Sequence, residues 1–318
     1  MALEEVSIRD EATGAQATIL TGFGFNCYKY TVPGADGPRD VLWAIDSFEN
    51  GDQRPSGSGI PILFPFPGRI GGAAYEWDGK EYTLTDGDGL GNAIHGFVHT
   101  RPWRVINKST NTVTGKFQAS VDAPEVLDLW PSDFLIRVAY AIGDGTLACE
   151  IQIENPGDKM LPCALGLHPY FRLPLSDAGK IDDCAVSVPA ADRWELKDLL
   201  PTGQVLPLSD DESLVAGKRF GDTQLDDVLT GLTCDEERVV TTVVDEASNT
   251  RQTISFSANF QNCVVFNPPH RKAICVEPYS CVPDCFRLES MGVDTGCWKL
   301  PPGESIDASF EIKIDAID

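Results

Sequence analysis

One of the four histidines in the chain, His168, lies between an apolar run and two aromatic rings in the segment Ala164–Phe171. Neutral imidazole titrates near physiological pH, so a histidine in a partly dry cleft is suited to carry a proton to or from a neutral polyol. The alternative is a core histidine bonded to a backbone carbonyl, because apolar neighbours also surround many histidines with a structural role. Two other segments favour the first interpretation.

Both of these segments bring a short apolar run to a polar residue. His95 follows a polar loop and precedes Gly96, and Glu277 leaves the apolar run Ala273–Val276 and is followed by Pro278. A glutamate at the end of a strand, fixed by the proline behind it, could be a proton acceptor with a raised pKa. Two imidazoles and a carboxylate without an evident nucleophile are suited to proton transfer rather than to covalent catalysis.

These segments belong to an ordered set of motifs that resembles the aldose 1-epimerases, or mutarotases. The family's order is an Arg-Ile segment, Asp-Gly-Lys-Glu-Tyr, His-Gly, His-x-Tyr-Phe, Glu-Pro and a closing turn before the last strand. The ordered set is fairly specific. The matching segments of this chain are Gly68–Ile70, Trp77–Tyr82, His95–Gly96, His168–Phe171, Glu277–Pro278 and Pro301–Glu304.

The resemblance implies a sugar held on the concave face of a β-sandwich and catalysis by proton transfer. To exchange the anomers of an aldose, the C1 hydroxyl must lose its proton while the ring oxygen O5 gains one, and the ring must then close on its other face. By resemblance, Glu277 takes the hydroxyl proton, His168 gives a proton to O5, and His95 helps to polarise the oxygens around O5. Each positioned proton-transfer group contributes roughly 10²–10⁴ in rate. This mechanism implies neither a metal nor another cofactor.

Two further residues match the substrate-binding positions of the family. Arg69 falls on its arginine and Asp226 on its aspartate, and a multi-donor fork combined with a pure acceptor suits a polyol. Two alternatives stay open for the aspartate: Asp227 is the match after a one-residue shift, or the residue is a solvated acid without a ligand. Aromatic residues could provide apolar faces for the sugar or simply belong to the core. They are Phe66, Tyr170, Phe171 and Tyr279.

Two positions depart from the family pattern. The residue before the arginine is often Asn in the family and is Gly68 here, so one sugar contact is lost or supplied elsewhere. After His95 the chain resembles the branch of hexose-6-phosphate epimerases, but His99 stands where that branch has a phosphate-binding arginine. If the following segment is a strand, at most one of Arg101 and Arg104 joins the pocket. We therefore expect free aldoses to have a higher kcat/KM than their 6-phosphates, unless a local cationic pocket attracts the phosphate.

The charge of the chain argues against polyanionic partners. The chain has 48 acidic and 25 basic residues and a formal net charge of −23, which repels nucleic acids and anionic membranes. The first ten residues lack the basic and apolar regions of a secretion signal, and no apolar run reaches membrane-spanning length. We expect a cytoplasmic protein with a small-molecule sugar substrate and with neither nucleic acid nor membrane as a partner. The sequence leaves its oligomeric state open.

Ten cysteines raise the question of a metal site. Cys149 and Cys163 lie in apolar strands, where reduced cysteine behaves as a small hydrophobic residue. A later group lacks the paired C-x-x-C spacing of structural zinc sites, so we expect thiols there and no metal. Its members are Cys275, Cys281, Cys285 and Cys297.

The strand pattern predicts an all-β fold, a large antiparallel β-sandwich of the galactose mutarotase type. Residues 147–154 alternate without an error between apolar and polar side chains, and 306–314 repeats this pattern. No segment keeps a long helical period, and the best candidate for a short helix is 124–130. Together with 22 prolines and 29 glycines, this favours a sandwich. The predicted hairpins join 134–141 to 147–154 through Gly143–Gly145, and 74–77 to 80–84 through Asp78–Gly79.

We expect one domain over residues 1–318. The most linker-like stretch is Pro207–Gly221, but a boundary there would separate Glu277 from His95 and His168. Three functions remain: a mutarotase of free aldoses, a hexose-6-phosphate 1-epimerase, and a non-catalytic carbohydrate-binding protein on the same scaffold. The presence of the acid, the base and the second histidine favours an enzyme.

Overall fold

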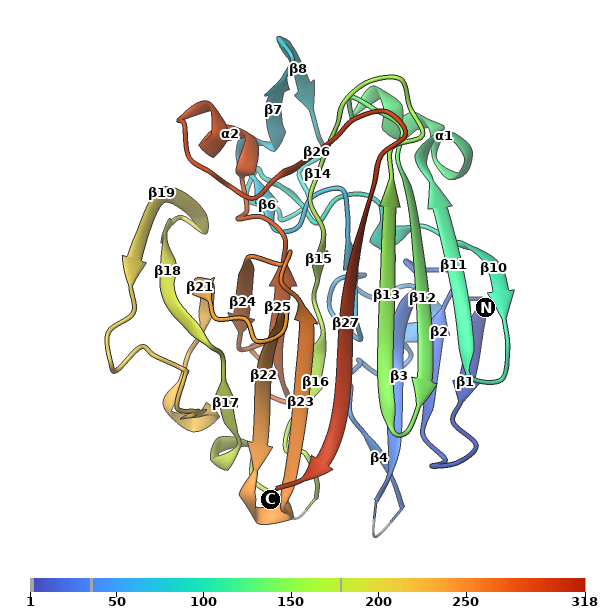
Figure 1. The fold of residues 1–318 in the computed structure, drawn as a ribbon, viewed down its shortest axis with the longest axis vertical. Coiled ribbons are helices and arrows are strands. Elements are labelled where there is room, and N and C mark those ends of the chain that lie inside the picture. Colours follow the sequence, from blue (N-terminus) through green and yellow to red (C-terminus); the bar gives the residue numbers. More distant parts are fainter. Residues whose placement is uncertain (1–2, 35–36, 178, 318) are drawn as a thin grey trace.

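The structure, a computed structural model, describes residues 3–34, 37–177 and 179–317. Antiparallel strands dominate it, and its helices are short, as the lack of a helical period predicted (Figure 1). Two large sheets of nine and eight strands and a four-stranded sheet near the N-terminus make up most of the fold. Among the described residues, no helix has both the length and the apolar character needed to span a membrane.

The nine-stranded sheet runs across Figure 1 from β10 to β17. It contains the predicted hairpin, in which Leu135 pairs with Glu154 and Gly143 with Thr146. Asp144 and Gly145 both have positive φ, as a two-residue turn of this type requires. In spatial order the strands are β10 (Arg104–Lys108), β11 (Thr112–Gln118), β12 (Leu135–Gly143), β13 (Thr146–Glu154), β27 (Ser305–Ala316), β23 (Thr250–Ser257), β22 (Arg238–Asp245), β17 (Ala185–Ser187) and β20 (Lys218–Arg219).

The eight-stranded sheet carries the residues of interest for function. Seven of its strands follow one path, and the eighth, β16 (Tyr170–Arg172), pairs with β25 beside that path. The seven strands in spatial order are β19 (Leu200–Pro207), β18 (Ala190–Lys197), β21 (Asp226–Leu232), β24 (Asn262–Phe266), β25 (Ala273–Tyr279), β15 (Gly166–Leu167) and β5 (Ile62–Leu63).

The main hydrophobic core joins the two large sheets. Val265 and Val276 of the eight-stranded sheet belong to the same buried cluster as Ile254 and Phe310 of the nine-stranded sheet. Successive side chains of a strand point to opposite faces, so one face of β24 and β25 packs into this core while the other face is free to line a site. This two-layer arrangement is the predicted β-sandwich.

The smaller strands form the four-stranded sheet and three two-stranded pairs. The second predicted hairpin is present as β7 and β8, and Asp78 and Gly79 have positive φ between them. The remaining strands are β1 (Glu5–Arg9), β2 (Gln16–Leu20), β3 (Asn26–Gly34), β4 (Gly37–Asp40), β6 (Arg69–Ile70), β7 (Ala74–Trp77), β8 (Lys80–Thr83), β9 (Ala93–Ile94), β14 (Leu161–Cys163) and β26 (Trp298–Leu300).

A short helix does occur where the sequence predicted one, as the 3₁₀ helix η4 (Pro124–Asp128). The pattern did not predict the six-residue helix α2. The linker-like stretch Pro207–Gly221 is tied into the fold, because Leu214 is buried and β20 pairs with β17. The other helices are α1 (Ala119–Asp122), α2 (Cys285–Ser290), η1 (Phe48–Asn50), η2 (Gly71–Ala73), η3 (Val98–Thr100), η5 (Ile181–Asp183), η6 (Phe220–Asp222) and η7 (Glu246–Ser248).

Candidate active site

Strand β25 places Glu277 on the face of the sheet that turns away from the core. Ile274 and Val276 pack into the main core, so the alternating pattern directs Cys275, Glu277 and Tyr279 to the opposite face. Glu277 is only 1% exposed, and its Oε2 accepts a hydrogen bond of 2.8 Å from the Tyr279 hydroxyl. The tyrosine therefore fixes the carboxylate and leaves its other oxygen free for chemistry.

His168 lies between β15 and β16, which both pair with β25. Its Nε2 is 3.3 Å from Glu277 Oε1, and its ring stacks on Tyr170 with centroids 4.8 Å apart and an interplanar angle of 2°. The backbone N–H of His168 donates to the carbonyl of Pro61. Strand pairing and ring stacking thus hold the imidazole at the carboxylate.

His95 approaches His168 from a different sheet. Its ring centroid is 5.6 Å from that of His168, with the two rings nearly perpendicular. The backbone explains why glycine follows His95. Gly96 has a φ of +68°, and a Cβ there would lie 2.2 Å from the carbonyl oxygen of Phe64. Glycine is needed at this close approach. His95 itself has a φ of +66°, which turns the chain at the site.

Arg69 is held by a buried carboxylate that the sequence did not single out. Its Nε donates to Asp88 at 2.9 Å, and the Asp88 side chain is 3% exposed. Burial would raise the pKa of Asp88, but hydrogen bonds from Asn92, Leu90 and Arg69 outweigh it and hold the pKa well below its usual range. Asp88 is therefore an anion at all ordinary pH values and fixes the guanidinium at one edge.

Steric contact also explains why Gly68 stands where asparagine is common in the family. Its φ is +66°, and a Cβ there would lie 2.6 Å from Pro283. Pro283 follows β25 and lines the same pocket as Arg69. The contact that an asparagine would make is thus excluded in this chain by packing between two neighbouring loops.

The structure distinguishes between the two neighbouring aspartates of β21. Asp226 and Val228 line the pocket, whereas Leu229, on the same face of the strand as Asp227, packs into the main core. The Asp226 side chain is reached by solvent at the mouth of the pocket. Partial desolvation by neighbouring atoms raises its pKa, and the charge of Arg69 acts in the opposite direction. Of the pair, Asp226 is the one that faces the histidines.

One pocket of about 170 Å³ brings together all five residues singled out from the sequence. They come from positions 69 to 277 and reach it because the central strands of one sheet and the loop around β6 and β9 meet there. Tyr170 and Tyr279 also line it, but Phe66 and Phe171 do not and belong to the core. The lining residues are Arg54, Gly68, Arg69, Ile94, His95, His168, Tyr170, Leu196, Leu199, Asp226, Val228, Val264, Phe266, Glu277, Tyr279 and Pro283.

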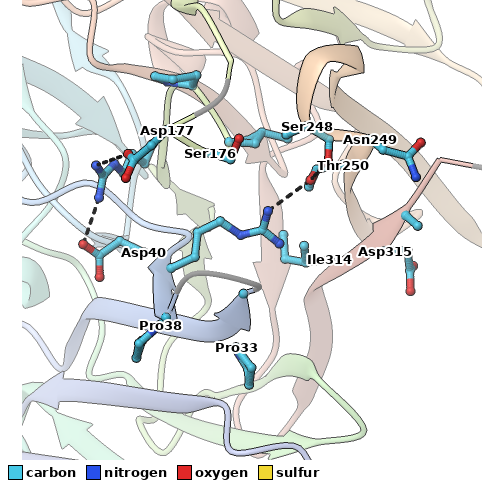
Figure 2. A pocket seen from close by; sticks show the side chains of 17 residues that line it. Pro33, Pro38, Asp40, Ser176, Asp177, Ser248, Asn249, Thr250, Ile314 and Asp315 are labelled. Atoms are coloured by element: carbon cyan, nitrogen blue, oxygen red, sulfur yellow. Dashed lines mark hydrogen bonds and ion pairs between the residues drawn. The ribbon is translucent and has the colours of Figure 1, made fainter.

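A larger hollow of about 700 Å³ lies beside the β3–β4 hairpin and shares no lining residue with this pocket (Figure 2). Its arginines are already engaged: Arg39 donates to the hydroxyl of Thr250, and Arg172 pairs with Asp40 and Asp177. It contains no histidine or glutamate. The larger hollow is therefore not the candidate active site. We place the active site in the smaller pocket, where the titratable groups converge.

Burial governs protonation in the pocket. It raises the pKa of Glu277 well above its usual value, although the Tyr279 hydrogen bond opposes this, and it lowers the pKa of His168 to about 3. Burial also lowers the pKa of His95 well below its usual value, with smaller contributions from His168 and His99. Burial therefore favours the neutral form of both Glu277 and His168.

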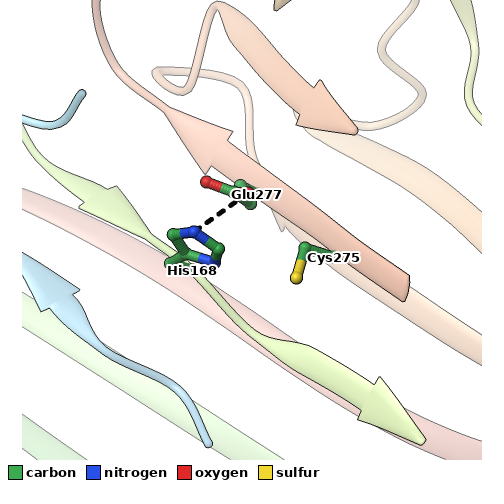
Figure 3. Close-up of side chains that lie close together, drawn as sticks. All are labelled: His168, Cys275 and Glu277. Carbon is green, nitrogen blue, oxygen red and sulfur yellow. Dashed lines mark ion pairs between the residues drawn. The ribbon is translucent and has the colours of Figure 1, made fainter. Parts of the chain in front are cut away.

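Cys275 lies next to this pair on the same face of β25 (Figure 3). Each of His168, Cys275 and Glu277 offers one possible metal-ligand atom, and these three atoms lie within 4.8 Å of one another. Such a trio could accept a soft metal ion, but burial raises the pKa of the Cys275 thiol well above its usual value. A metal ion at this trio would have to displace the thiol proton of Cys275.

The positions that bear on phosphate binding lie elsewhere. His99 is buried, and burial lowers its pKa to about 4; neither it nor Arg101 nor Arg104 lines the pocket. Arg101 pairs with Glu125, and Arg104 forms two hydrogen bonds to Asp122.

A second arginine of the pocket, Arg54, was not identified from the sequence. It lies in a polar loop without a strand pattern, and a distant hydrogen bond, from the Tyr170 hydroxyl to the carbonyl of Ser56, holds this loop beside the site.

Comparisons with known proteins agree with the fold. The chain resembles a galactose mutarotase-like protein from Clostridium acetobutylicum (20% identity, TM-score 0.86, 99% of each chain) and an aldose epimerase homologue from C. elegans (21%, TM-score 0.83, all of each chain). These identities show the fold alone. Curated relatives are LacX of Lactococcus lactis, 26% identical over 54% of each protein, and the uncharacterised YihR of Escherichia coli K12, 24% identical over 73% of this chain and 72% of YihR.

The match to LacX thus spans about half the length of that protein. The family model described as aldose 1-epimerase covers far more of the chain and matches residues 5–313. This chain therefore belongs to the aldose 1-epimerase family.

Proposed function

We propose that this protein interconverts the α and β anomers of an aldose by general acid and base catalysis of ring opening and closure. The observation that carries the proposal is the Glu277–His168 pair, 3.3 Å apart in a pocket that also contains His95, Arg69 and Asp226. An acid and a base at hydrogen-bonding distance in one sugar-sized pocket are what the reaction requires.

In this mechanism Glu277 accepts the proton of the C1 hydroxyl and His168 donates a proton to O5. Burial favours the neutral form of both groups, the carboxylic acid of Glu277 and the uncharged imidazole of His168. A sugar hydroxyl that donates to Glu277 and a ring oxygen that accepts from His168 favour the ionic form, in which the proton has moved to the imidazole. After rotation about C1–C2, the same steps in reverse close the ring.

The remaining groups position the sugar. The Tyr279 hydroxyl holds one oxygen of Glu277, so the other is directed toward His168 and the substrate. Asp226 can accept hydrogen bonds from sugar hydroxyls, and Arg69, fixed by Asp88, can donate them. His95, kept neutral by burial, can donate one hydrogen bond to an oxygen near O5 without carrying a charge.

Two-dimensional NMR exchange spectroscopy of glucose and of galactose tests this proposal. We expect exchange cross-peaks between the two anomeric protons that grow with enzyme concentration above the buffer-catalysed rate. The rival function, non-catalytic carbohydrate binding, predicts ligand-induced shifts in the protein without any added exchange. Saturating binding of several aldoses without added exchange would overturn the enzyme assignment.

A further inference from the structure

Arg54 is the pocket residue that the proposed chemistry does not use. It begins the turn Arg54–Gly57, in which the Gly57 N–H donates to the Arg54 carbonyl at 3.0 Å. The turn is anchored to the site, because the Tyr170 hydroxyl donates to the carbonyl of Ser56 at 3.0 Å and the same tyrosine ring stacks on His168. The loop and the proposed acid are thus joined through one side chain.

The guanidinium of Arg54 has unused hydrogen-bonding capacity. Its Nε donates to the hydroxyl of Ser56 at 3.2 Å. Within residues 3–34, 37–177 and 179–317 it forms no ion pair, whereas Arg69, Arg101 and Arg104 each pair with an acidic side chain. In a chain with a net charge of −23, a pocket arginine without an acidic partner leaves a positive fork open to a ligand.

The fork lies on the histidine side of the pocket. The carbonyl of Ser56 accepts from the Tyr170 hydroxyl, and the Tyr170 ring stacks on His168 with centroids 4.8 Å apart. In agreement with this geometry, the charge of Arg54 adds to the larger effect of burial in lowering the pKa of His95 and of His168, whereas Arg69 acts on Glu277 and Asp226 as well as on His95. If His168 serves O5, the sugar carbon C5 lies beside it, because C5 is bonded to O5. C6 is attached to C5, so a group at C6 extends toward the histidine side and Arg54.

We propose that Arg54 makes the site selective for aldoses with a compact anionic group at C6, a carboxylate or a phosphate. This inference rests on the proposed function, which sets the orientation of the sugar. The net charge of the chain led us to expect a higher kcat/KM for free aldoses unless a local cation attracts the phosphate. Arg54 is such a cation, so the expected preference is reversed. A carboxylate takes the place of the C6 hydroxymethyl group with little added volume, whereas a phosphate ester of the C6 hydroxyl extends farther out and carries about −1.5 to −2 charges.

Matched substrates isolate the charge. Glucuronate and glucuronamide have nearly the same shape and differ in charge, and glucose 6-phosphate is compared with glucose, each after subtraction of its rate without enzyme. At low salt, we expect a higher kcat/KM for the anionic member of at least one pair. The pair with the larger ratio identifies carboxylate or phosphate as the preferred group.

Arg54→Gln should reduce the anion-to-neutral ratio at least about 10-fold, the size of a lost charge-assisted hydrogen bond. Arg54→Lys should keep part of the ratio, because the charge remains but the fork is lost. The control is Arg9→Gln, an exposed residue of β1 outside the pocket that changes the net charge equally and should leave the ratio unchanged. A smaller ratio is expected near physiological salt, since screening weakens exposed charge pairs.

A binding titration separates failure of this inference from failure of the proposed function. If no aldose is turned over, the function is wrong, but glucuronate or glucose 6-phosphate must still bind more tightly than its neutral partner in the parent and lose that advantage in Arg54→Gln. Equal effects of Arg54→Gln on charged and neutral sugars, or ratios of one or below in the parent, would overturn the inference.

Discussion

Replacement of Glu277 by Gln removes the proposed base with little change in shape. In the structure Glu277 is 1% exposed, accepts from the Tyr279 hydroxyl at 2.8 Å and faces His168 Nε2 at 3.3 Å. A carboxamide can orient its oxygen to Tyr279 and its NH₂ to the neutral imidazole, so both contacts survive. What it cannot do is accept the proton of the C1 hydroxyl.

The expected loss follows from that single defect. A positioned proton-transfer group is worth roughly 10²–10⁴ in rate, or about 2.7–5.4 kcal/mol of barrier at 1.36 kcal/mol per decade. Stability should not fall, because burial raises the pKa of Glu277 and so disfavours a folded state that carries its charge. At pH 7, above the ordinary glutamate pKa, an uncharged Gln removes this penalty, and Tm should be equal to or above that of the parent.

Polarimetry of freshly dissolved α-aldose measures the rate, and a thermal unfolding scan measures Tm. The matched control is Glu76→Gln, an exposed residue of β7 with the same chemical change, which should alter neither quantity. A Glu277→Gln variant within a factor of ten of the parent rate would refute the base assignment. A large fall in Tm would instead show that Glu277 has a mainly structural role.

Three further predictions concern the same pocket. The pH–rate profile of kcat/KM should have no acidic limb near the ordinary histidine pKa, because burial lowers the pKa of His168 to about 3, and its basic limb should lie above the ordinary glutamate range, because burial raises the pKa of Glu277; an acidic limb near pH 6.5 would contradict this. Asp88→Asn should raise KM up to about 10-fold with a smaller change in kcat and cost about 1–3 kcal/mol of stability, because it releases Arg69 and removes a buried acceptor; steady-state kinetics and chemical denaturation measure both, and an unchanged KM would exclude the positioning role. Treatment with EDTA should leave turnover unchanged, because the proposed proton transfer uses only Glu277 and His168; activity lost with EDTA and restored by Zn²⁺ would reveal a metal at this site.

The fold was accessible from the sequence where local patterns are strong. The perfect alternation of 147–154 and the Asp-Gly turns predicted both hairpins, and the structure contains both. Helix α2 was missed because a six-residue helix that begins after a left-handed Asp284 has too few turns to show a helical period. Its role is nevertheless specific, since the Asp284 N–H donates to the Arg69 carbonyl at 2.8 Å.

The site was predictable in its residue types but not in its supports. His95, His168 and Glu277 follow apolar runs or carry motifs, whereas Asp88 and Arg54 lie in polar loops, where charged residues are common and their partners lie far along the chain. Tyr279 was considered only as an apolar surface, because the hydrogen bond to Glu277 depends on both side chains sharing one face of β25. Long-range contacts of this kind leave no local pattern in a sequence.

A crystal structure of the Glu277→Gln variant with a bound aldose tests the central claim most directly, since this variant should bind sugar without turning it over. The account predicts the C1 hydroxyl within hydrogen-bonding distance of the substituted side chain and O5 within hydrogen-bonding distance of His168 Nε2. A sugar whose C1 and O5 face away from both residues, or one bound only in the hollow beside the β3–β4 hairpin, would contradict it.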